Sequence, residues 1–421
     1  MGEYRRPVLG LAISRAATLG LVKALVLTNE FPPKVYGGAG MHVAELTSAM
    51  RGQLDLDIRT FGEQDETAPG WRVRGYAPPA GTGGPDSRLR PALEALGRDL
   101  AMTADPVDAD LVHCHTWYSH FGGLLVQRAY GLPLVVTVHS LEPLRPWKRE
   151  QLGGAYDLSS WVERTALEAA DAVIAVSGDT RDDVLRLFAV PPERVEVIHN
   201  GIDATFFVPD PATDVLAKHG IDPAQPYALF VGRITRQKGI VHLMRAIRHL
   251  DPGIGVVLAA GQPDTAELAA EVTAGVAEAQ RNRPGVTWIP EMLSREGIRQ
   301  LYSHAAVFVC PSVYEPFGLT NLEAMACEAA VVASAVGGIP EVVVHGETGI
   351  LVPLQLSPDE PMSPAEPDRF ARDLATAIND LVADPVRRAA MGRAGRVRAT
   401  EQFGWSAVAA RTLELYRRLT A

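Results

Sequence analysis

Short apolar segments alternate with helical patterns along this chain, and each half of the chain contains one such series. Apolar segments of this kind, with no polar face, are typical of strands that are buried on both sides of a parallel sheet. In the first half, the predicted strands are residues 23–28, 56–61, 71–75, 111–114, 134–138, 172–176 and 195–198. In the second half, they are residues 228–231, 256–260, 286–289, 306–310 and 331–334. The pattern predicts an α/β protein of two tandem Rossmann-like, doubly wound domains that face a central cleft.

The expected domain boundaries follow from this pattern. With 421 residues, the chain is long enough for two or three domains. We expect domains at residues 22–203 and 204–403, because residues 200–224 are rich in proline, poor in periodicity and suited to a linker. An arginine interrupts the apolar run in residues 1–21, so a signal peptide is not expected there. These residues are predicted to be a disordered extension, or to result from a start site assigned upstream of the true one. Residues 404–421 are predicted to form a helix that packs back on the first domain.

The charge balance and the cysteines limit the partners and the compartment. A formal net charge of -10 argues against nonspecific binding of nucleic acid. The arginines between Arg387 and Arg398 are predicted to form a solvated helix face. No stretch is long and apolar enough to span a membrane. The three cysteines, Cys114, Cys310 and Cys327, cannot all pair with one another, so we expect buried reduced thiols in a cytoplasmic protein. The sequence leaves open whether the protein forms a homodimer.

The stretch 308–325, FVCPSVYEPFGLTNLEAM, joins a buried strand to a helix that we expect Thr320 or Asn321 to cap. This order directs unpaired amides and the positive end of the helix dipole to one place, which makes an anion site. Glu315 and Glu323 bracket that site. A carboxylate would repel a phosphate, so each is expected to bind hydroxyl groups of a sugar or ribose. Two acids alone would more often be a solvated loop residue and a dipole contact, but the surrounding loop favours a site.

Two cations converge on the end of the first strand of the second domain. Arg233 leaves this strand in FVGRITRQKG, and Lys238 lies at the start of the next helix. Such a pair suits a diphosphate that must be held and then stabilised as a leaving group. Surface cations beside a turn are the commoner case, but positive charge at a helix N-terminus opposes the dipole and requires a reason. We therefore expect a diphosphate site here.

The motifs of the first domain also lie at strand ends. Gly37 and Gly38, in GGAG, would let backbone amides approach a phosphate closely, but GGAG is not the GxGxxG pattern of a nicotinamide site. His113 and His115 lie on one face of a strand, and a metal site is open to them. No third ligand is obvious, so a core or supporting role is favoured. His139 ends the next strand, where an imidazole could hydrogen-bond a sugar hydroxyl.

Together these motifs resemble a known family. GGAG, HCHTW, VTVHS, VIHNGID, FVGRITRQKG, EPFGLTNLEAM, GGIPEVV and GETGILV look like the retaining GT-B glycosyltransferases of family four, over nearly the whole chain from Lys23. EFPPKVYGGAGMHV and HSLEPLRPWKREQLGGAY resemble the actinobacterial glycogen synthase group more closely. That group uses ADP-glucose, and its members are described as glycogen synthases or as α-maltose-1-phosphate synthases acting on glucose 1-phosphate.

The resemblance implies a role for each matching residue. Arg233 and Lys238 match the cations at the donor diphosphate. Glu315 and His139 match residues at the donor sugar, and Glu323 matches a residue at the ribose. The implied catalytic residues are His139, Arg233, Lys238 and Glu315. The implied donor-binding residues are Gly37, Gly38, Arg233, Lys238, Glu315, Phe317, Gly318, Leu319, Thr320 and Glu323. The chain departs from the broader starch and glycogen synthases in having valine for the lysine of their KTGG turn and threonine for the aspartate of their HxHDW motif.

These departures fall on the acceptor and donor-sugar side, so the acceptor is the open question. The expected acceptor residues are Tyr36, His115, Arg145 and Lys148. The basic side chains gather in residues 141–151, LEPLRPWKREQ, and a helix start with solvated cations is the commoner case. A neutral glucan would need no cations, whereas a phosphorylated acceptor needs compensating charge. We therefore expect a hexosyltransferase that moves glucose from ADP-glucose to glucose 1-phosphate and makes α-maltose 1-phosphate. Direct elongation of an α-1,4-glucan is the alternative, and no motif distinguishes adenine from uracil in the donor.

No cofactor and no bound metal are expected, because side chains and helix amides would neutralise the diphosphate. No carboxylate stands out as a nucleophile, so the expected mechanism is a front-face displacement in which the departing phosphate helps to deprotonate the acceptor. The Asp-x-Asp pairs at residues 55–57 and 108–110 would suit a metal-dependent transferase, but they lie at strand entrances of the other domain. A sugar-nucleotide epimerase and a nucleotide-sugar-binding regulator are the alternatives from other classes.

Overall fold

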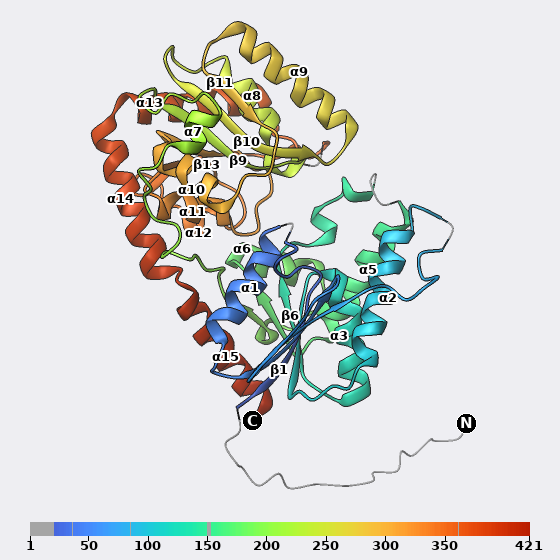
Figure 1. The fold of residues 1–421 in the computed structure, drawn as a ribbon. Coiled ribbons are helices and arrows are strands. Elements are labelled where there is room, and N and C mark those ends of the chain that lie inside the picture. Colours follow the sequence, from blue (N-terminus) through green and yellow to red (C-terminus); the bar gives the residue numbers. More distant parts are fainter. Residues whose placement is uncertain (1–20, 36, 85, 150–152, 361) are drawn as a thin grey trace, which may run out of the picture.

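The structure is a computed structural model that describes residues 21–35, 37–84, 86–149, 153–360 and 362–421. The described chain folds into two α/β domains, each built on a sheet of its own (Figure 1). The predicted fold of two tandem Rossmann-like domains is confirmed. The predicted N-terminal extension lies outside the described residues, apart from Leu21.

The sheet of the first domain has eight strands in the order β3-β4-β2-β1-β5-β6-β7-β8. The strands are β1 (Lys23–Leu27), β2 (Asp55–Phe61), β3 (Asp65–Ala68), β4 (Trp71–Tyr76), β5 (Leu111–His115), β6 (Leu134–Val138), β7 (Ala172–Ala175) and β8 (Val195–Val197). All neighbours pair in parallel except β3, which is antiparallel to β4. The strand β3 was not predicted, because its residues, DETA, are mostly exposed and form no apolar run. An antiparallel strand at the edge needs only one neighbour.

Helices cover both faces of this sheet. They are α1 (Gly38–Met50), α2 (Arg90–Ala104), α3 (Trp117–Tyr130), α5 (Gly154–Ala169) and α6 (Gly178–Leu187), with short 3-10 turns η1 (Glu142–Leu144) and η2 (Pro192–Arg194). Successive side chains of a strand point to opposite faces. In β1, Ala24 and Val26 therefore join the core beneath α1, and Leu25 and Leu27 join the core beneath α2 and α3. This arrangement explains why the strands are apolar throughout.

The sheet of the second domain has six parallel strands in the order β11-β10-β9-β12-β13-β14. The strands are β9 (Tyr227–Ile234), β10 (Gly255–Pro263), β11 (Val286–Ile289), β12 (Val307–Cys310), β13 (Ala330–Ser334) and β14 (Gly349–Val352). The expected number was five. The sixth, β14, begins with a glycine and lies at the sheet edge, where only its first and last residues are buried.

The helices of the second domain include one inside the predicted linker. They are α7 (Asp214–Lys218), η3 (Arg236–Lys238), α8 (Ile240–Ile247), α9 (Ala266–Asn282), α10 (Arg295–His304), α11 (Leu319–Ala326), α12 (Ile339–Val342), α13 (Pro367–Ala383) and α14 (Pro385–Gln402). The arginines of α14 were expected to form a solvated face, but not all of them do. Arg396 donates to the carbonyl groups of Phe207 and Ala326, and Arg398 donates to those of Glu341 and Val342. They tie α14 to the rest of its domain.

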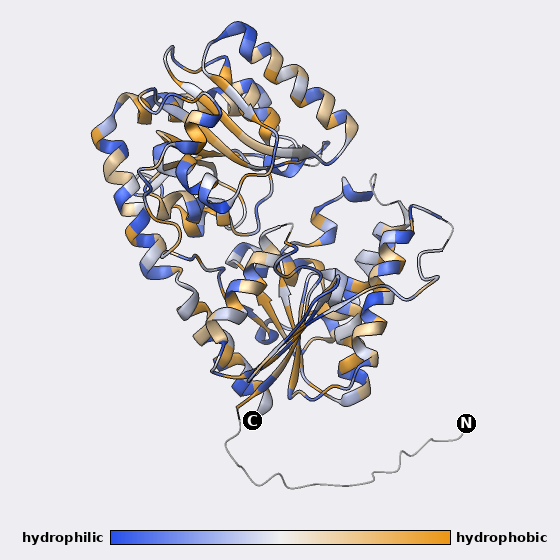
Figure 2. Ribbon diagram, viewed as in Figure 1, coloured by the Kyte–Doolittle hydropathy of each residue, from blue (hydrophilic) through white to orange (hydrophobic). Residues whose placement is uncertain are grey.

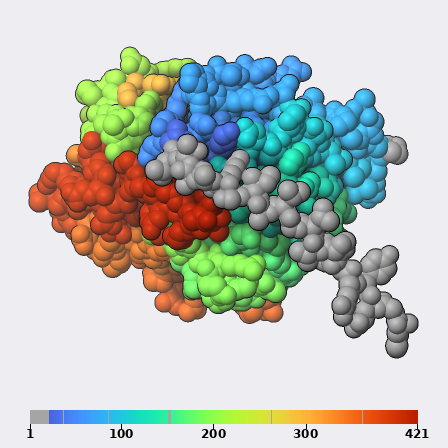
Figure 3. Space-filling model, turned by 90° about the horizontal axis from the view of Figure 1, so that it is seen from below, coloured from blue at the N-terminus to red at the C-terminus, as the bar shows by residue number. Residues whose placement is uncertain are grey.

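The last helix, α15 (Trp405–Thr420), packs against α1 of the first domain (Figures 1 and 3). The chain thus crosses between the domains twice, and the crossings lie side by side. Ile202 of the first crossing donates its N–H to the Phe403 carbonyl of the second at 2.7 Å. A Cβ at Gly201 would lie only 2.5 Å from the Trp405 ring. The crossings therefore form one hydrogen-bonded strap between the domains.

The apolar residues lie mainly on the strands and on the helix faces that contact them (Figure 2). Cys114, Cys310 and Cys327 are buried and form no disulfide, as expected from their apolar surroundings. Within the described residues, no helix combines the length and the apolar character that crossing a membrane requires.

Candidate active site

The strand order places the candidate site between the domains. In both sheets, the direction in which successive strands are added reverses beside the first strand of the domain. The strand β1 lies between β2 and β5, and β9 lies between β10 and β12. Ligands of such sheets bind beyond the carboxyl ends of the strands at this point. Here the domains touch. Leu141 donates its N–H to the Tyr314 hydroxyl at 3.4 Å, and the Ser177 hydroxyl donates to the Pro316 carbonyl at 2.7 Å.

An ion pair joins the predicted cation and acid motifs of the second domain. Lys238 Nζ lies 2.7 Å from Glu315 Oε2, and the Ser312 hydroxyl donates to the same oxygen at 3.2 Å. Burial lowers the pKa of Lys238, but the Glu315 carboxylate outweighs burial and leaves that pKa raised. Gly239 permits the pairing, because a Cβ there would lie 1.9 Å from the Pro311 carbonyl oxygen. Lys238 is therefore a charged group held at the end of β12.

Arg233 has an acidic neighbour that the sequence analysis did not identify. One of its Nη atoms lies 3.7 Å from an oxygen of Asp264, which directly follows β10. Burial raises the pKa of Asp264, whereas Arg233, Arg145 and Lys148 all oppose that rise. The two cations expected to bind the acceptor thus lie within electrostatic reach of the donor domain. The position of Asp264 at a strand end was the signal that could have revealed it.

Helix α11 begins earlier than predicted. The expected cap was Thr320 or Asn321, but the N-cap is Gly318 in a left-handed conformation with φ 107°, and Leu319 is the first helical residue. Only glycine adopts this conformation without strain. Asn321 is fully buried inside the first turn, and Thr320 is half-buried beside it. The N-terminal amides of α11 therefore start at the loop itself, as an anion site requires.

The glycine turn of the first domain meets this helix. A Cβ at Gly38 would lie 3.1 Å from Cδ1 of Leu319, so the turn and the first turn of α11 face each other across the domain interface. The amide of Gly37 donates to a Glu30 carboxylate oxygen at 2.8 Å, which fixes the turn. Gly37 is thus a support for the turn. Tyr36, predicted to bind the acceptor, lies outside the described residues.

Glu323 lies one turn into α11 and is half-buried. The Tyr302 hydroxyl donates a hydrogen bond of 3.0 Å to its Oε2. Burial raises the pKa of Glu323 to about 7, and the hydrogen bond from Tyr302 partly opposes this rise. Near neutral pH, this carboxyl group is therefore divided between its neutral and charged forms.

The side chain of Phe317, predicted to bind the donor, does not face a ligand site. It is 2% exposed and lies between two rings, with centroid distances of 5.6 Å to His199 and 5.8 Å to Phe403. Phe317 is a core residue and can contribute only its backbone. The loop that holds Glu315 and Phe317 packs closely against Gly337 of the GGIPEVV motif. A Cβ at Gly337 would lie 2.0 Å from the Glu315 carbonyl oxygen, so only glycine allows this contact.

Three histidines gather at the strand ends of the first domain. His139 Nε2 lies 3.1 Å from His115 Nδ1, and His42 of α1 joins them, with one ring nitrogen of each residue within 4.8 Å of the others. Burial lowers the pKa of His42 to about 4 and the pKa values of His115 and His139 well below their usual range. All three imidazoles are neutral at pH 7. His42 was not apparent as a member of this group from the sequence, because it comes from a distant helix.

The other histidine of the HCH motif is structural. His113 Nδ1 lies 2.6 Å from the Tyr416 hydroxyl, and its Nε2 lies 2.7 Å from the Thr137 hydroxyl. Both ring nitrogens are therefore satisfied inside the protein. This residue joins β5 and β6 to α15, as expected for a core histidine.

The predicted acceptor cations have a buried acid beneath them. Glu142 Oε1 lies 3.1 Å from Lys148 Nζ and 3.5 Å from an Nη atom of Arg145. The Ser159 hydroxyl donates to the other Glu142 oxygen at 3.0 Å. Burial, together with the nearby Glu142, raises the pKa of Glu163 well above its usual range, which favours its neutral form. Two cations therefore share one charged carboxylate, so their positive charge is reduced but not cancelled.

This arrangement can be compared with known proteins. Residues 36–206 match the model of Glycosyltransferase Family 4, and residues 212–361 match that of Glycosyl transferases group 1. Over 407 residues, the chain is 49% identical to alpha-maltose-1-phosphate synthase of Mycolicibacterium smegmatis, which covers 95% of this chain and 100% of that protein. The chain is a GT-B glycosyltransferase of family four.

Two further proteins resemble this glycosyltransferase over nearly all of its length. Alpha-maltose-1-phosphate synthase of Mycobacterium tuberculosis is 47% identical over 407 residues, which cover 95% of this chain and 100% of that protein. The structure of sucrose-phosphate synthase from Thermosynechococcus elongatus is 27% identical, with a TM-score of 0.75, and covers 94% of this chain and 99% of that one. The predicted family is confirmed.

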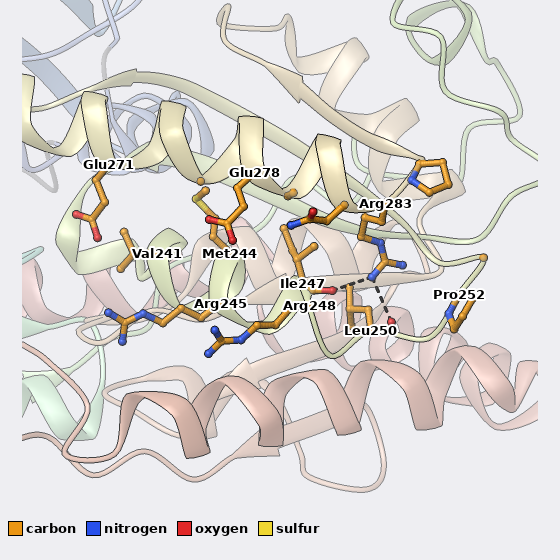
Figure 4. A pocket seen from close by; sticks show the side chains of 15 residues that line it. Val241, Met244, Arg245, Ile247, Arg248, Leu250, Pro252, Glu271, Glu278 and Arg283 are labelled. Atoms are coloured by element: carbon orange, nitrogen blue, oxygen red, sulfur yellow. Dashed lines mark hydrogen bonds between the residues drawn. The ribbon is translucent and has the colours of Figure 1, made fainter.

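A cavity of about 560 Å³ lies elsewhere in this glycosyltransferase, between α8 and α9 (Figure 4). Met244 and Ile247 of α8 contribute to its apolar lining, and Arg245 and Glu278 are among its charged groups. None of the predicted site residues lines it. The candidate active site therefore rests on the converging motifs and not on the size of a cavity.

Proposed function

We propose that this glycosyltransferase moves glucose from ADP-glucose to glucose 1-phosphate, with retention of anomeric configuration, and makes α-maltose 1-phosphate with an α-1,4 link. The observation that carries this proposal is the full-length similarity to proteins named alpha-maltose-1-phosphate synthase. The site geometry supports it, because donor-type charges and acceptor-type cations face each other between the domains.

The donor half holds the diphosphate. Lys238 and Arg233 supply positive charge at the ends of β9 and β12, and the N-terminus of α11 supplies amides. Each cation is paired with a carboxylate, which positions it before the ligand arrives. Glu315 is then available to the hydroxyl groups of the donor sugar, and Glu323 to the ribose. Preorganised charge of this kind is most effective where charge develops in the transition state.

The chemistry is a displacement at the anomeric carbon. The bond from C1 of glucose to the diphosphate oxygen breaks, and a bond from C1 to the O4 atom of the acceptor forms on the same face. The acceptor proton moves to the departing phosphate oxygen. Lys238 and Arg233 stabilise the negative charge that collects on the leaving diphosphate. His139 and the neighbouring neutral imidazoles orient sugar hydroxyls, which uncharged rings can do as donors or acceptors.

The acceptor half recognises a phosphate. Arg145 and Lys148 share the single carboxylate of Glu142, so net positive charge remains for the phosphate group of glucose 1-phosphate. Both cations also act on Asp264 of the donor domain. This supports an acceptor phosphate close to the donor, where the sugar hydroxyl must approach C1. A neutral glucan would leave these charges without a partner.

The reaction as proposed needs no cofactor and no resident metal, because side chains and amides provide the charge neutralisation. We also propose a cytoplasmic location, in keeping with three buried thiols. A homodimer stays a prediction, which light scattering of the full chain can test.

The deciding experiment is an acceptor screen. The protein is incubated with ADP-glucose or UDP-glucose and with glucose 1-phosphate or glycogen, and the products are identified by mass spectrometry and NMR. We expect a disaccharide phosphate with an α-1,4 link, formed faster from ADP-glucose. Faster elongation of glycogen would contradict the acceptor, and a rearranged donor without acceptor would indicate an epimerase.

A further inference from the structure

The histidine cluster has the composition of a metal site. His42, His115 and His139 come from α1, β5 and the end of β6, and one ring nitrogen of each lies within 4.8 Å of the others. Two imidazole nitrogens bound to one tetrahedral zinc ion lie about 3.4 Å apart, since each Zn–N bond is about 2.0–2.1 Å. The His115–His139 pair, at 3.1 Å, already has nearly this spacing. His42 would need to approach by up to about 1.4 Å.

The surroundings of His42 determine which of its ring nitrogens can bind a metal ion. Its Nδ1 lies 2.7 Å from Asn200 Oδ1, an oxygen that can only accept, so Nδ1 carries the proton. The lone pair is then on Nε2, which is buried and has no hydrogen-bond partner among the described residues. Histidines that bind metals are commonly oriented in this way by a second group. Trp405 holds the other side of the ring, with centroids 5.3 Å apart.

A second unsatisfied nitrogen belongs to the same cluster. His115 Nε2 is buried and also has no partner within the described chain. Zinc held by His115 Nδ1, the nitrogen 3.1 Å from His139, would leave this Nε2 atom protonated, so it is the unpartnered Nε2 of His42 that indicates a missing ligand. His139 is the least buried of the three and lies at the domain interface, which gives an ion a route in.

We propose that His42, His115 and His139 bind one Zn²⁺ ion, and that this ion excludes the donor sugar. Imidazole ligands favour zinc and its transition-metal neighbours over Mg²⁺ or Ca²⁺. Three histidine ligands leave a fourth position open to water. Zinc is therefore an inhibitor of this enzyme, and the reaction itself requires no metal. The exclusion of the donor depends on the proposed function, which places His139 at the donor glucose, whereas the binding of zinc does not.

Calorimetry of the full chain, freed of metal with EDTA, tests the binding. Titration with zinc chloride should show one site per chain of micromolar affinity or tighter. His42→Phe keeps a ring against Trp405 and should weaken binding at least tenfold. His42→Gln keeps a polar partner for Asn200 and should do the same, so a folding defect in one variant does not decide the outcome. His242→Phe, which removes a buried histidine of the other domain, should leave binding unchanged.

Competition then tests the exclusion. ADP-glucose or UDP-glucose should weaken zinc binding, and the zinc concentration that halves activity should rise at least tenfold in the His42 variants. Zinc binding that both His42 variants retain would overturn the proposed site. Binding at the cluster without competition from either nucleotide sugar would overturn the exclusion. Zinc binding that persists while no nucleotide sugar serves as donor would contradict the proposed function and support the metal site.

Discussion

The two halves of the active site achieve polarity by different means. The donor half is built from charges, with Lys238 against Glu315 and Arg233 near Asp264. The first domain instead presents neutral imidazoles at the site, and its nearby cations are already bound to Glu142. In the proposed reaction, charge is concentrated where the diphosphate leaves, and uncharged rings lie where the neutral sugar is oriented. Preorganised charge is thus placed where charge would develop during the proposed reaction.

Removing a donor cation tests this comparison most severely. Lys238→Ala or Arg233→Ala should lower kcat about 10²–10³-fold, because each removes a contact that strengthens as the diphosphate leaves. Steady-state kinetics and thermal melting of each variant give the two quantities needed. The matched control is Arg245→Ala, on the following helix α8 of the same domain, where it lines the separate cavity, and it should retain normal turnover. Near-normal kcat in either donor-site variant would show that this cation does not stabilise the leaving diphosphate.

The acceptor cations should give a smaller effect, confined to binding. Arg145→Ala is expected to raise KM for glucose 1-phosphate about 10- to 100-fold, since a hydrogen bond to a charged group contributes about 1.5–3 kcal/mol. KM for the donor should hardly change. Lys148→Ala should act in the same direction but also lower Tm, because it leaves Glu142 buried with one partner fewer.

Arg149→Ala is the control for the acceptor cations. Arg149 is exposed and pairs with Asp157 at 2.6 Å, away from Glu142. Its removal should leave both Michaelis constants unchanged. If Arg149→Ala and Arg145→Ala raise KM equally, the effect is a general one of net charge, and the specific role of Arg145 is wrong.

The pH dependence of donor binding probes Glu323, a donor-half acid that is only partly charged near pH 7. The folded-state pKa of Glu323 is raised to about 7, above its ordinary 4.5. Ribose hydroxyls donate more strongly to the charged form, so KM for the donor should rise about 3- to 10-fold as pH falls from 8 to 6. Stability follows the opposite sign: the contribution of this group is fully present below pH 4.5 and is lost as pH rises through about 7.

Glu323→Gln should abolish that pH dependence. Its KM for the donor should be flat between pH 6 and 8, because an amide does not titrate. If the variant keeps the full pH dependence, another group causes the titration, and the proposed contact of Glu323 with the ribose is wrong.

The smallest expected effect is that of chelation. Activity should be unchanged in excess EDTA, since side chains and amides provide all of the charge at the diphosphate. Activity that rises on adding EDTA to protein exposed to zinc would agree with an inhibitory ion at the histidines. Complete loss, restored by Mg²⁺ or Mn²⁺, would show that the cations of the donor half are insufficient.

The proximity of Lys238 and Glu315 could be predicted from the sequence because each lies in a contiguous motif at a strand end. Lys238 and Glu315 each follow a strand of the same sheet, and parallel strands bring their carboxyl ends together. The two parallel sheets were also predictable, since buried strands must be apolar. The edge strands β3 and β14 were not predicted, because fewer of their residues are buried and their sequences therefore show no clear apolar pattern.

The first domain's half was less predictable because its contacts are long-range. His42 reaches Asn200 over 158 residues, and His113 reaches Tyr416 over 303. No local spacing reports such pairs. The burial of the Phe317 side chain could not be predicted for a related reason, because its contact with His199 depends on how the domains meet.

The position of α15 has a consequence for how the polypeptide folds during translation. This helix covers one face of the first sheet with Val408, Leu413 and Tyr416, yet it leaves the ribosome only after the whole second domain. The second domain can complete its own core beforehand, as domains generally fold as units. Until α15 emerges, the apolar surface beside α1 stays uncovered and open to chaperones. The domain that is synthesised first is therefore the one that matures last.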